Sequence, residues 1–215
     1  MESIWQQFVD GLMQTSALEF IAVITGIISV IYSRMENILV YPVGIISTTI
    51  FIYLSMKGHL YGEASVNLFY TVMSLYGWWL WSRKKDDNTP ELKITRSNRR
   101  DWIGQILFFL TFYIVIYACL HWLQKAFAPE AIPWADAFAS ATAYTGMWLM
   151  AKKKVESWYW WILTDIASVP LYYSKGYVFT GFQFLILTIL AFAGLQAWKH
   201  KSQSPNLPAQ RQATC

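Results

Sequence analysis

Long apolar runs separated by short polar breaks dominate the pattern along this 215-residue chain. Each run is 18 to 23 residues long, which matches the length that a helix needs to cross the ~30 Å hydrocarbon core of a bilayer. The runs cover residues 17–34, 37–56, 64–82, 102–124, 134–151, 155–174 and 177–198. The pattern predicts an all-α integral membrane protein with seven transmembrane helices.

The basic residues between the runs predict the orientation of the chain. Fourteen of the 17 Lys and Arg residues fall on one side if the seven spans alternate, and most of them lie in 83–101 and in the tail after 198. The other side has only Lys57, Lys125 and Lys175. The positive-inside rule then puts the N-terminus outside and the C-terminus in the cytoplasm. Three segments are predicted outside the spans: an interfacial N-terminal segment at 1–16, a cytoplasmic loop at 83–101 and a disordered cytoplasmic tail at 199–215.

A weak internal repeat connects the two halves of the chain. Gly77-x-x-x-Trp81 and Gly194-x-x-x-Trp198 are both followed by basic residues and lie 117 positions apart, although such matches also arise by coincidence between aromatic, basic-ended helices. Arg34-Met-Glu36 and Lys154-Val-Glu156 match with an offset of 120.

The repeat predicts two parallel triplets of helices that are joined by one linking helix. Because a single span separates them, the two triplets point the same way across the membrane, as in transporters built from parallel repeats. The first three-helix repeat, the linking helix and the second three-helix repeat cover 17–82, 102–124 and 134–198. The tryptophans Trp148 and Trp198 are expected in the aromatic belt at the membrane surface.

Composition supports a membrane protein and argues against several other classes. The chain is 55% hydrophobic and 14% charged, and its net charge of +4 comes from loops, which gives no reason to expect nucleic acid as a partner. The three histidines are scattered, Cys119 and Cys215 form no ligand pattern, and no phosphate-binding loop or nucleophile motif occurs. We expect no cofactor, no metal and no enzymatic activity.

One predicted span contains an acidic residue near its middle. Asp165 lies about 14 Å from Glu156 along a helix, roughly half the depth of the bilayer core. Trp158, Trp161 and Asp165 share one helical face. An acid at that depth marks a ligand site or pathway by default, and indole faces beside a carboxylate suit an organic cation. The simpler alternative is a protonated Asp that bonds a neighbouring helix.

Two other spans carry polar side chains at comparable depth. Asn67, Tyr70 and Ser74 share one face of span 64–82, and Gln183 lies in span 177–198. Amides inside a membrane bond either to neighbouring helices or to a polar ligand, so these residues are candidates for either role.

At several places the chain resembles the Pnu vitamin transporters, which are similar to SWEET sugar transporters in fold. The resemblance covers roughly residues 17–200 and rests on 37–51 with Gly44-Ile-Ile, on Leu60-Tyr61, on Tyr76-Gly77-Trp78 with Trp81, and on Lys154-Val-Glu156-Ser-Trp158-x-x-Trp161. It implies that Trp158, Trp161 and Asp165 bind the heteroaromatic ring of a substrate, with Asn67 and Tyr70 opposite them.

The resemblance extends to both branches of that family. The nicotinamide riboside branch (PnuC) tends to have Asn where this chain has Asp165 and Gln where it has Asn67. Those two departures make the chain look more similar to the thiamine branch (PnuT), whose substrate carries a cationic ring and an amine that can donate to a carboxylate.

The sequence thus predicts uptake of a small cationic vitamin across the bacterial inner membrane, with thiamine first and nicotinamide riboside as the alternative. The resemblance implies facilitated diffusion by alternating access, with trapping by a cytoplasmic vitamin kinase. A substrate-binding subunit of an ATP-driven importer and a lipid-modifying membrane enzyme are more distant alternatives. The sequence leaves open whether the chain works alone or as a homo-oligomer in the bilayer.

Overall fold

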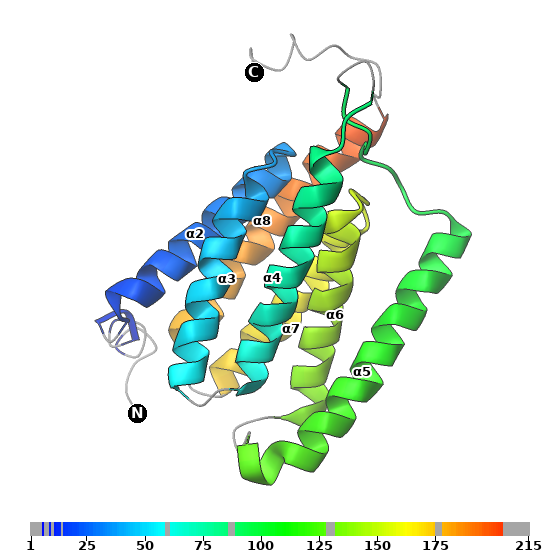
Figure 1. The fold of residues 1–215 in the computed structure, drawn as a ribbon. Coiled ribbons are helices and arrows are strands. Elements are labelled where there is room, and N and C mark those ends of the chain that lie inside the picture. The colour runs from blue at the N-terminus through cyan, green and yellow to red at the C-terminus, as the bar shows by residue number, and fades with distance from the viewer. Residues whose placement is uncertain are drawn as a thin grey trace.

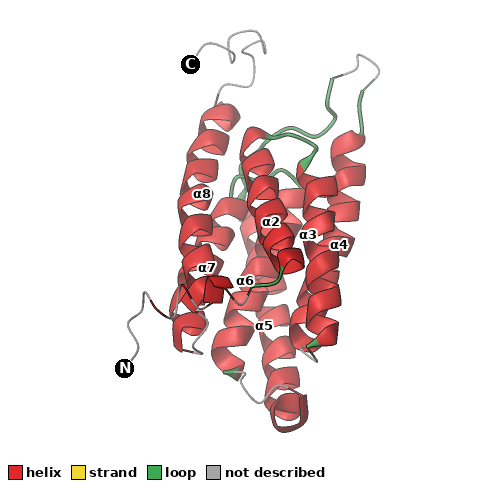
Figure 2. Ribbon diagram, turned by 90° about the vertical axis from the view of Figure 1, so that its left-hand side faces the viewer, coloured by secondary structure: helices red, strands yellow, loops and turns green. Residues whose placement is uncertain are grey.

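The computed structural model describes residues 6, 9, 11–13, 15–58, 61–85, 89–127, 132–174 and 178–203. These residues form helices and loops, without a β-strand among them (Figure 2). The long helices run in the order α2 Ala17–Met35, α3 Val40–Lys57, α4 Tyr61–Ser82, α5 Arg99–Phe127, α6 Pro133–Ala151, α7 Ser157–Ser174 and α8 Val178–Gln203 (Figure 1).

The helices lie close to the predicted runs, but the expected flanking segments differ or fall outside the description. The tail was expected from residue 199, whereas α8 continues to Gln203, and 204–215 lie outside the described residues. Most of the expected interfacial segment 1–16 also lies outside them. The predicted loop 83–101 ends earlier, because α5 begins at Arg99.

Local sequence sets several of the helix ends. The side chain of Ser16 accepts a hydrogen bond from the backbone N–H of Glu19 and so caps the start of α2. Glu36 ends α2 in a left-handed conformation with φ 63°, and its N–H donates to Ser33. Lys153, just after α6, has φ 51°. Each of these two left-handed residues follows the first helix of its triplet.

Six of the seven long helices in the described residues form a closed ring, and α5 lies outside it. Going round the ring, α2 packs against α3, α3 against α4, α4 against α6, α6 against α7, α7 against α8, and α8 against α2. Exchanging α2 with α6, α3 with α7 and α4 with α8 leaves these neighbours unchanged, as two-fold related triplets require. The linking helix α5 packs on the outside of α6 (Figure 1).

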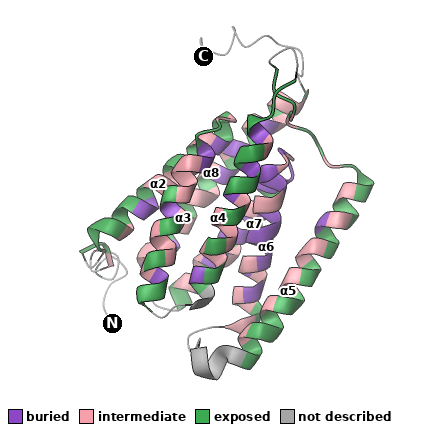
Figure 3. Cartoon of the chain, viewed as in Figure 1, coloured by how far each residue is buried: buried purple, intermediate pink, exposed green. Residues whose placement is uncertain are grey.

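Four of the described helices are long and apolar enough to cross a membrane: α2, α3, α8 and residues Arg99–Trp122 of α5. These helices direct many large apolar side chains outward, as lipid-facing helices do. By contrast, α6 and α7 bury much of their surface within the bundle (Figure 3). The helices α4, α6 and α7 are not among these four, so the seven-span topology stays a prediction.

The core is densest at the end of the bundle where α2, α4, α6 and α8 end, which we call the basic end because Arg34, Lys152 and Lys199 lie there. Here Trp158 of α7 occupies the space beside Gly194 of α8, where an added Cβ would overlap the indole. Trp158 also packs edge-on against Trp198, with ring centroids 5.6 Å apart at 86°.

The same arrangement occurs in the first triplet. Tyr41 of α3 fills the space beside Gly77 of α4 and meets Trp81 edge-on, with ring centroids 5.1 Å apart at 86°. Trp198 has no exposed surface and Trp81 is 6% exposed, so assigning Trp198 to the membrane-surface belt was wrong. A glycine one turn before each tryptophan lets these aromatic side chains enter the helix interfaces.

Candidate binding site

The α7 face predicted from spacing divides into two environments. Trp158, near the start of the helix, is 1% exposed and wedged between Gly194 and Trp198. One turn further on, Trp161 is only partly buried and points toward α4 and α6. Asp165, another turn along, is 4% exposed. Helical spacing placed the three side chains on one side, while packing gives Trp158 a structural position and leaves Trp161 partly exposed.

Trp161 belongs to a group of aromatic side chains from three helices, which we call the aromatic group: Phe69, Tyr70, Tyr144 and Trp161. The ring of Tyr70 on α4 lies 6.0 Å from Trp161 and 6.4 Å from Tyr144 on α6. Phe69 stacks on Tyr144 at 4.0 Å with an interplanar angle of 21°. The structure therefore brings Tyr70 and Trp161 together, as predicted from the resemblance.

Sequence reasoning missed two members of the aromatic group. Tyr144 sits among Ala, Thr and Gly residues of α6, which bury most of their surface. It is the single aromatic residue between Phe138 and Trp148, and that isolation was the available signal. Phe69 is adjacent to Tyr70 in sequence, but its contact with Tyr144 depends on the packing of α4 against α6.

A glycine on α6 makes room for Trp161. A Cβ added to Gly146 would lie 3.3 Å from three atoms of the Trp161 indole, including the ring nitrogen Nε1. This contact fixes one side of the indole against α6. The ring of Tyr70 also lies close to the indole and is tilted by 53° relative to it.

Asp165 lies near the aromatic group without a basic partner in the described structure. It is within electrostatic range of Tyr70, and among the described residues no Lys or Arg forms an ion pair with it. Its neighbours on α7 are buried hydroxyl residues: Thr164, which donates to Thr142 of α6 at 2.9 Å, and Ser168. A carboxyl group at this position is available to a ligand with a positive charge or with hydrogen-bond donors.

The other predicted site residues have different surroundings. The amide of Asn67 donates to the carbonyl of Glu63 on its own helix at 3.0 Å. Ser74 is buried on α4. Gln183 lines an apolar hollow of about 150 Å³ with Val23 and Ile27 of α2, away from the α4–α6–α7 contacts of the aromatic group.

The chemistry of this arrangement suits a flat, electron-poor ring. Aromatic faces attract cations and stack on heteroaromatic rings, and one carboxyl group can supply a counter-charge or accept a hydrogen bond. No group of three or more metal-ligating side chains occurs within the part of the chain that the structure describes.

Comparison with known proteins identifies the family. The model of a family described as nicotinamide mononucleotide transporters matches residues 16–200. The chain belongs to this family. Together with its long apolar helices, membership makes it a multi-pass membrane protein of a transporter family.

The names of two relatives give three substrates: nicotinamide riboside, riboflavin and roseoflavin. The nicotinamide riboside transporter PnuC of Escherichia coli (strain K12) is 27% identical over 203 residues, which is 85% of each chain. The riboflavin/roseoflavin transporter RibM of Streptomyces davaonensis is 27% identical over 188 residues, covering 86% of this chain and 85% of that protein. These relatives do not support the expected assignment to the thiamine branch.

The fold is also that of a known transporter structure. A crystal structure of the vitamin B3 transporter PnuC matches 93% of this chain and 88% of its own with a TM-score of 0.69. At 21% sequence identity this likeness concerns the fold.

Proposed function

We propose that this transporter carries nicotinamide riboside, or a closely similar pyridinium nucleoside, across the bacterial inner membrane. The observation that carries the proposal is the pairing of Tyr70 with Trp161 beside Asp165, within a chain of this family. A pyridinium ring is cationic and flat, which is the chemistry that two aromatic faces and one carboxyl group recognise. The name of the E. coli relative supports this substrate over thiamine.

In this proposal Trp161 and Tyr70 contact the ring, and Asp165 faces its charge or an amide donor. Trp158, Asn67, Ser74 and Gln183 stay predictions as substrate contacts. Trp158 would reach the substrate only if α7 and α8 part, because its indole is packed against Gly194 and Trp198 in this conformation.

The transport mechanism that we propose is alternating access between the two triplets. The six-helix ring is built from α2–α4 and α6–α8, and rocking of one triplet against the other would open each end in turn. The basic end would face the cytoplasm, as the positive-inside rule predicts. We expect facilitated diffusion, with a cytoplasmic kinase trapping the substrate by phosphorylation.

Uptake into proteoliposomes that contain only this protein tests the proposal. We expect nicotinamide riboside to equilibrate across the membrane without ATP or an ion gradient, with a rate that saturates. Empty liposomes and liposomes with the Trp161→Ala variant serve as controls. Tight binding without uptake would instead favour a subunit of an ATP-driven importer. If the protein neither binds nor takes up nicotinamide riboside, the proposal is overturned.

Thiamine is the second candidate because of Asp165, where the resemblance to the Pnu transporters implies an uncharged Asn in the nicotinamide riboside branch. The same uptake assay with unlabelled thiamine and riboflavin as competitors separates the candidates. Inhibition by thiamine at lower concentrations than by nicotinamide riboside would make thiamine the substrate.

A further inference from the structure

Three pairs of residues at the basic end contact each other across the two triplets, and in each pair the partners are 117 positions apart. The hydroxyl of Ser33 donates to the sulfur of Met150 at 2.9 Å. The ammonium of Lys153 donates to Glu36 at 2.8 Å. The rings of Trp81 and Trp198 lie 6.1 Å apart.

Such contacts locate the axis that relates the triplets. When two units are related by a two-fold rotation, a residue can contact its own counterpart only where it lies next to the axis. All three pairs lie at the basic end, so the two triplets touch each other next to the axis at this end. If the triplets move apart there to open the end, these pairs must separate.

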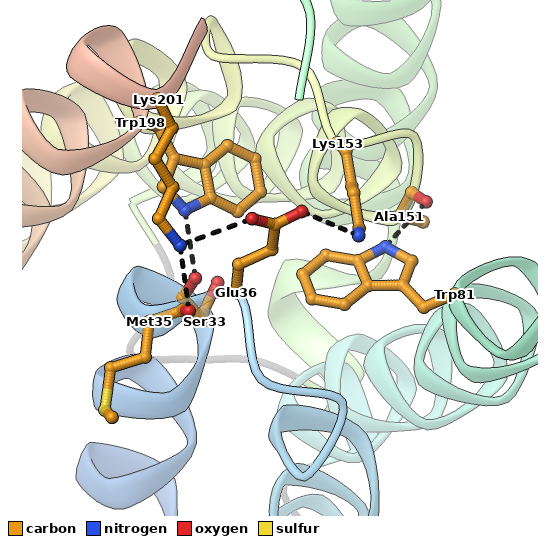
Figure 4. A network of polar contacts seen from close by, with 8 residues as sticks. All are labelled: Ser33, Met35, Glu36, Trp81, Ala151, Lys153, Trp198 and Lys201. Atoms are coloured by element: carbon orange, nitrogen blue, oxygen red, sulfur yellow. Dashed lines mark hydrogen bonds and ion pairs between the residues drawn. The ribbon is translucent and has the colours of Figure 1, made fainter. Parts of the chain in front are cut away.

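Glu36 is the centre of this contact (Figure 4). One of its carboxylate oxygens accepts from Lys153 and the other lies 3.3 Å from Lys201 of α8. The side chain of Lys153 is only 5% exposed, whereas that of Glu36 is 25% exposed. We call Glu36, Lys153 and Lys201 the Glu36 cluster.

The surroundings of Lys153 hold its charge in place. Its ammonium lies 4.5 Å from the centre of the Trp81 ring, so the cation has a carboxylate on one side and an aromatic face on another. The Trp81 indole in turn donates to the carbonyl of Ala151 at 3.1 Å, in the second triplet. In the reverse direction the Trp198 indole donates to the carbonyl of Ser33 at 3.0 Å, in the first triplet.

The loop after α4 is attached to the same place. The backbone N–H of Thr95 donates to the carbonyl of Lys153, and the N–H of Val155 donates to the carbonyl of Thr95. Leu92 and Ile94 pack against the aromatic core of the basic end. This part of the loop would therefore move with the second triplet when the end opens.

We propose that the Glu36 cluster is the gate at the basic end of the transport pathway. When the Glu36–Lys153 ion pair is formed, it holds the two triplets together next to their axis. When this ion pair breaks, the basic end opens. An ion pair suits this role better than an apolar plug, because water entering the opening solvates both separated charges and keeps the closed and open states near in free energy. The proposal rests on the proposed transport function, which supplies the pathway to be gated.

Accessibility of a reporter cysteine at position 33 tests the gate without any substrate. Ser33 is 3% exposed and lies one helical turn inside Glu36, and cysteine is close to it in size. Cys119 and Cys215 are first replaced by Ser, and the purified Ser33→Cys protein in nanodiscs is reacted with a charged maleimide. We expect Glu36→Gln to raise the labelling rate about tenfold or more, because it removes a charge-assisted hydrogen bond from the closed state.

A matched control is available at the same end. Arg83 and Glu91 form an ion pair in which both side chains are about half exposed, and neither residue takes part in the three 117-offset contacts. Glu91→Gln makes the same change of charge and should leave the labelling rate within about twofold of the parent. Equal labelling in Glu36→Gln and the parent would overturn the gate.

A covalent link keeps the gate testable if Glu36→Gln fails to fold. Cysteines at positions 36 and 153, joined by a reducible bifunctional thiol reagent, should abolish uptake while the protein still binds nicotinamide riboside from the opposite end. Reduction should restore uptake. If the linked protein takes up substrate at the rate of the unlinked protein, the gate is overturned. If the unlinked protein neither binds nor takes up nicotinamide riboside, the proposed substrate is overturned, while the labelling result still tests the gate.

Discussion

The Trp161 indole of α7 lies directly over Gly146 of α6, with no side chain between the ring and the helix backbone. Gly146 thus determines how close α6 and α7 come and where the indole stands relative to Tyr70. The relationship links helix packing to the geometry of the candidate site, because a change in one residue of α6 repositions a proposed substrate contact on α7.

Replacing Gly146 with alanine tests this link. The added methyl would lie 3.3 Å from the indole, which is tighter than ordinary contact, so the ring must shift by a few tenths of an ångström. We expect the dissociation constant for nicotinamide riboside to rise about threefold to tenfold, the range set by one aromatic contact. Gly104→Ala is the control, since a Cβ there meets nothing within 4 Å, and calorimetry gives both values. Unchanged affinity in Gly146→Ala would mean that Trp161 does not contact the substrate.

The two tryptophans of the predicted α7 face should respond differently to truncation. Trp158→Ala empties a fully buried position beside Gly194 and should cost about 3–5 kcal/mol of stability. Trp161→Ala, at a partly buried position, should lower substrate affinity with a smaller loss of stability. Thermal unfolding followed by circular dichroism, together with calorimetric binding, separates the two effects. Equal losses of stability in both variants would contradict the division of roles.

Asp165→Asn tests the counter-charge argument. Removing the negative charge should weaken binding of a cation, and we expect thiamine to lose about tenfold in affinity. Nicotinamide riboside should lose less, because the resemblance to the Pnu transporters implies an uncharged Asn at this position in its branch. Competition binding with both compounds gives the ratio. Riboflavin serves as the internal control because its ring is neutral. Equal losses for all three compounds would show that the substitution acts through folding rather than charge.

Helix positions could be predicted from the sequence because apolar runs of membrane length have few alternative structures. The glycine and tryptophan spacing indicated the internal repeat, but it did not predict that Gly194 and Trp198 both contact Trp158. The burial of Trp198 could not be predicted, because an aromatic residue at the end of an apolar run has the same local sequence whether it faces lipid or a neighbouring helix.

The composition of the site depended on which helices meet. Periodicity on α4 and α7 placed Tyr70 and Trp161 on particular faces, but the presence of Tyr144 follows from the packing of α4 against α6. Similarly, aligning Arg34-Met-Glu36 with Lys154-Val-Glu156 made Glu36 the counterpart of Glu156, whereas the contacts pair Glu36 with Lys153 at the offset of 117. Glu156 instead accepts hydrogen bonds from Ser97.

The outlying position of α5 has a consequence for how such a chain can arise and change. A helix that lies outside the ring is not needed to close it, yet by crossing the membrane once it would let two copies of a three-helix ancestor insert the same way up. Two separate three-helix chains could assemble the same ring without it. Within a fused gene, selection would then act on the outward face of α5 for apolar character rather than for particular residues, and that face should accumulate neutral substitutions fastest.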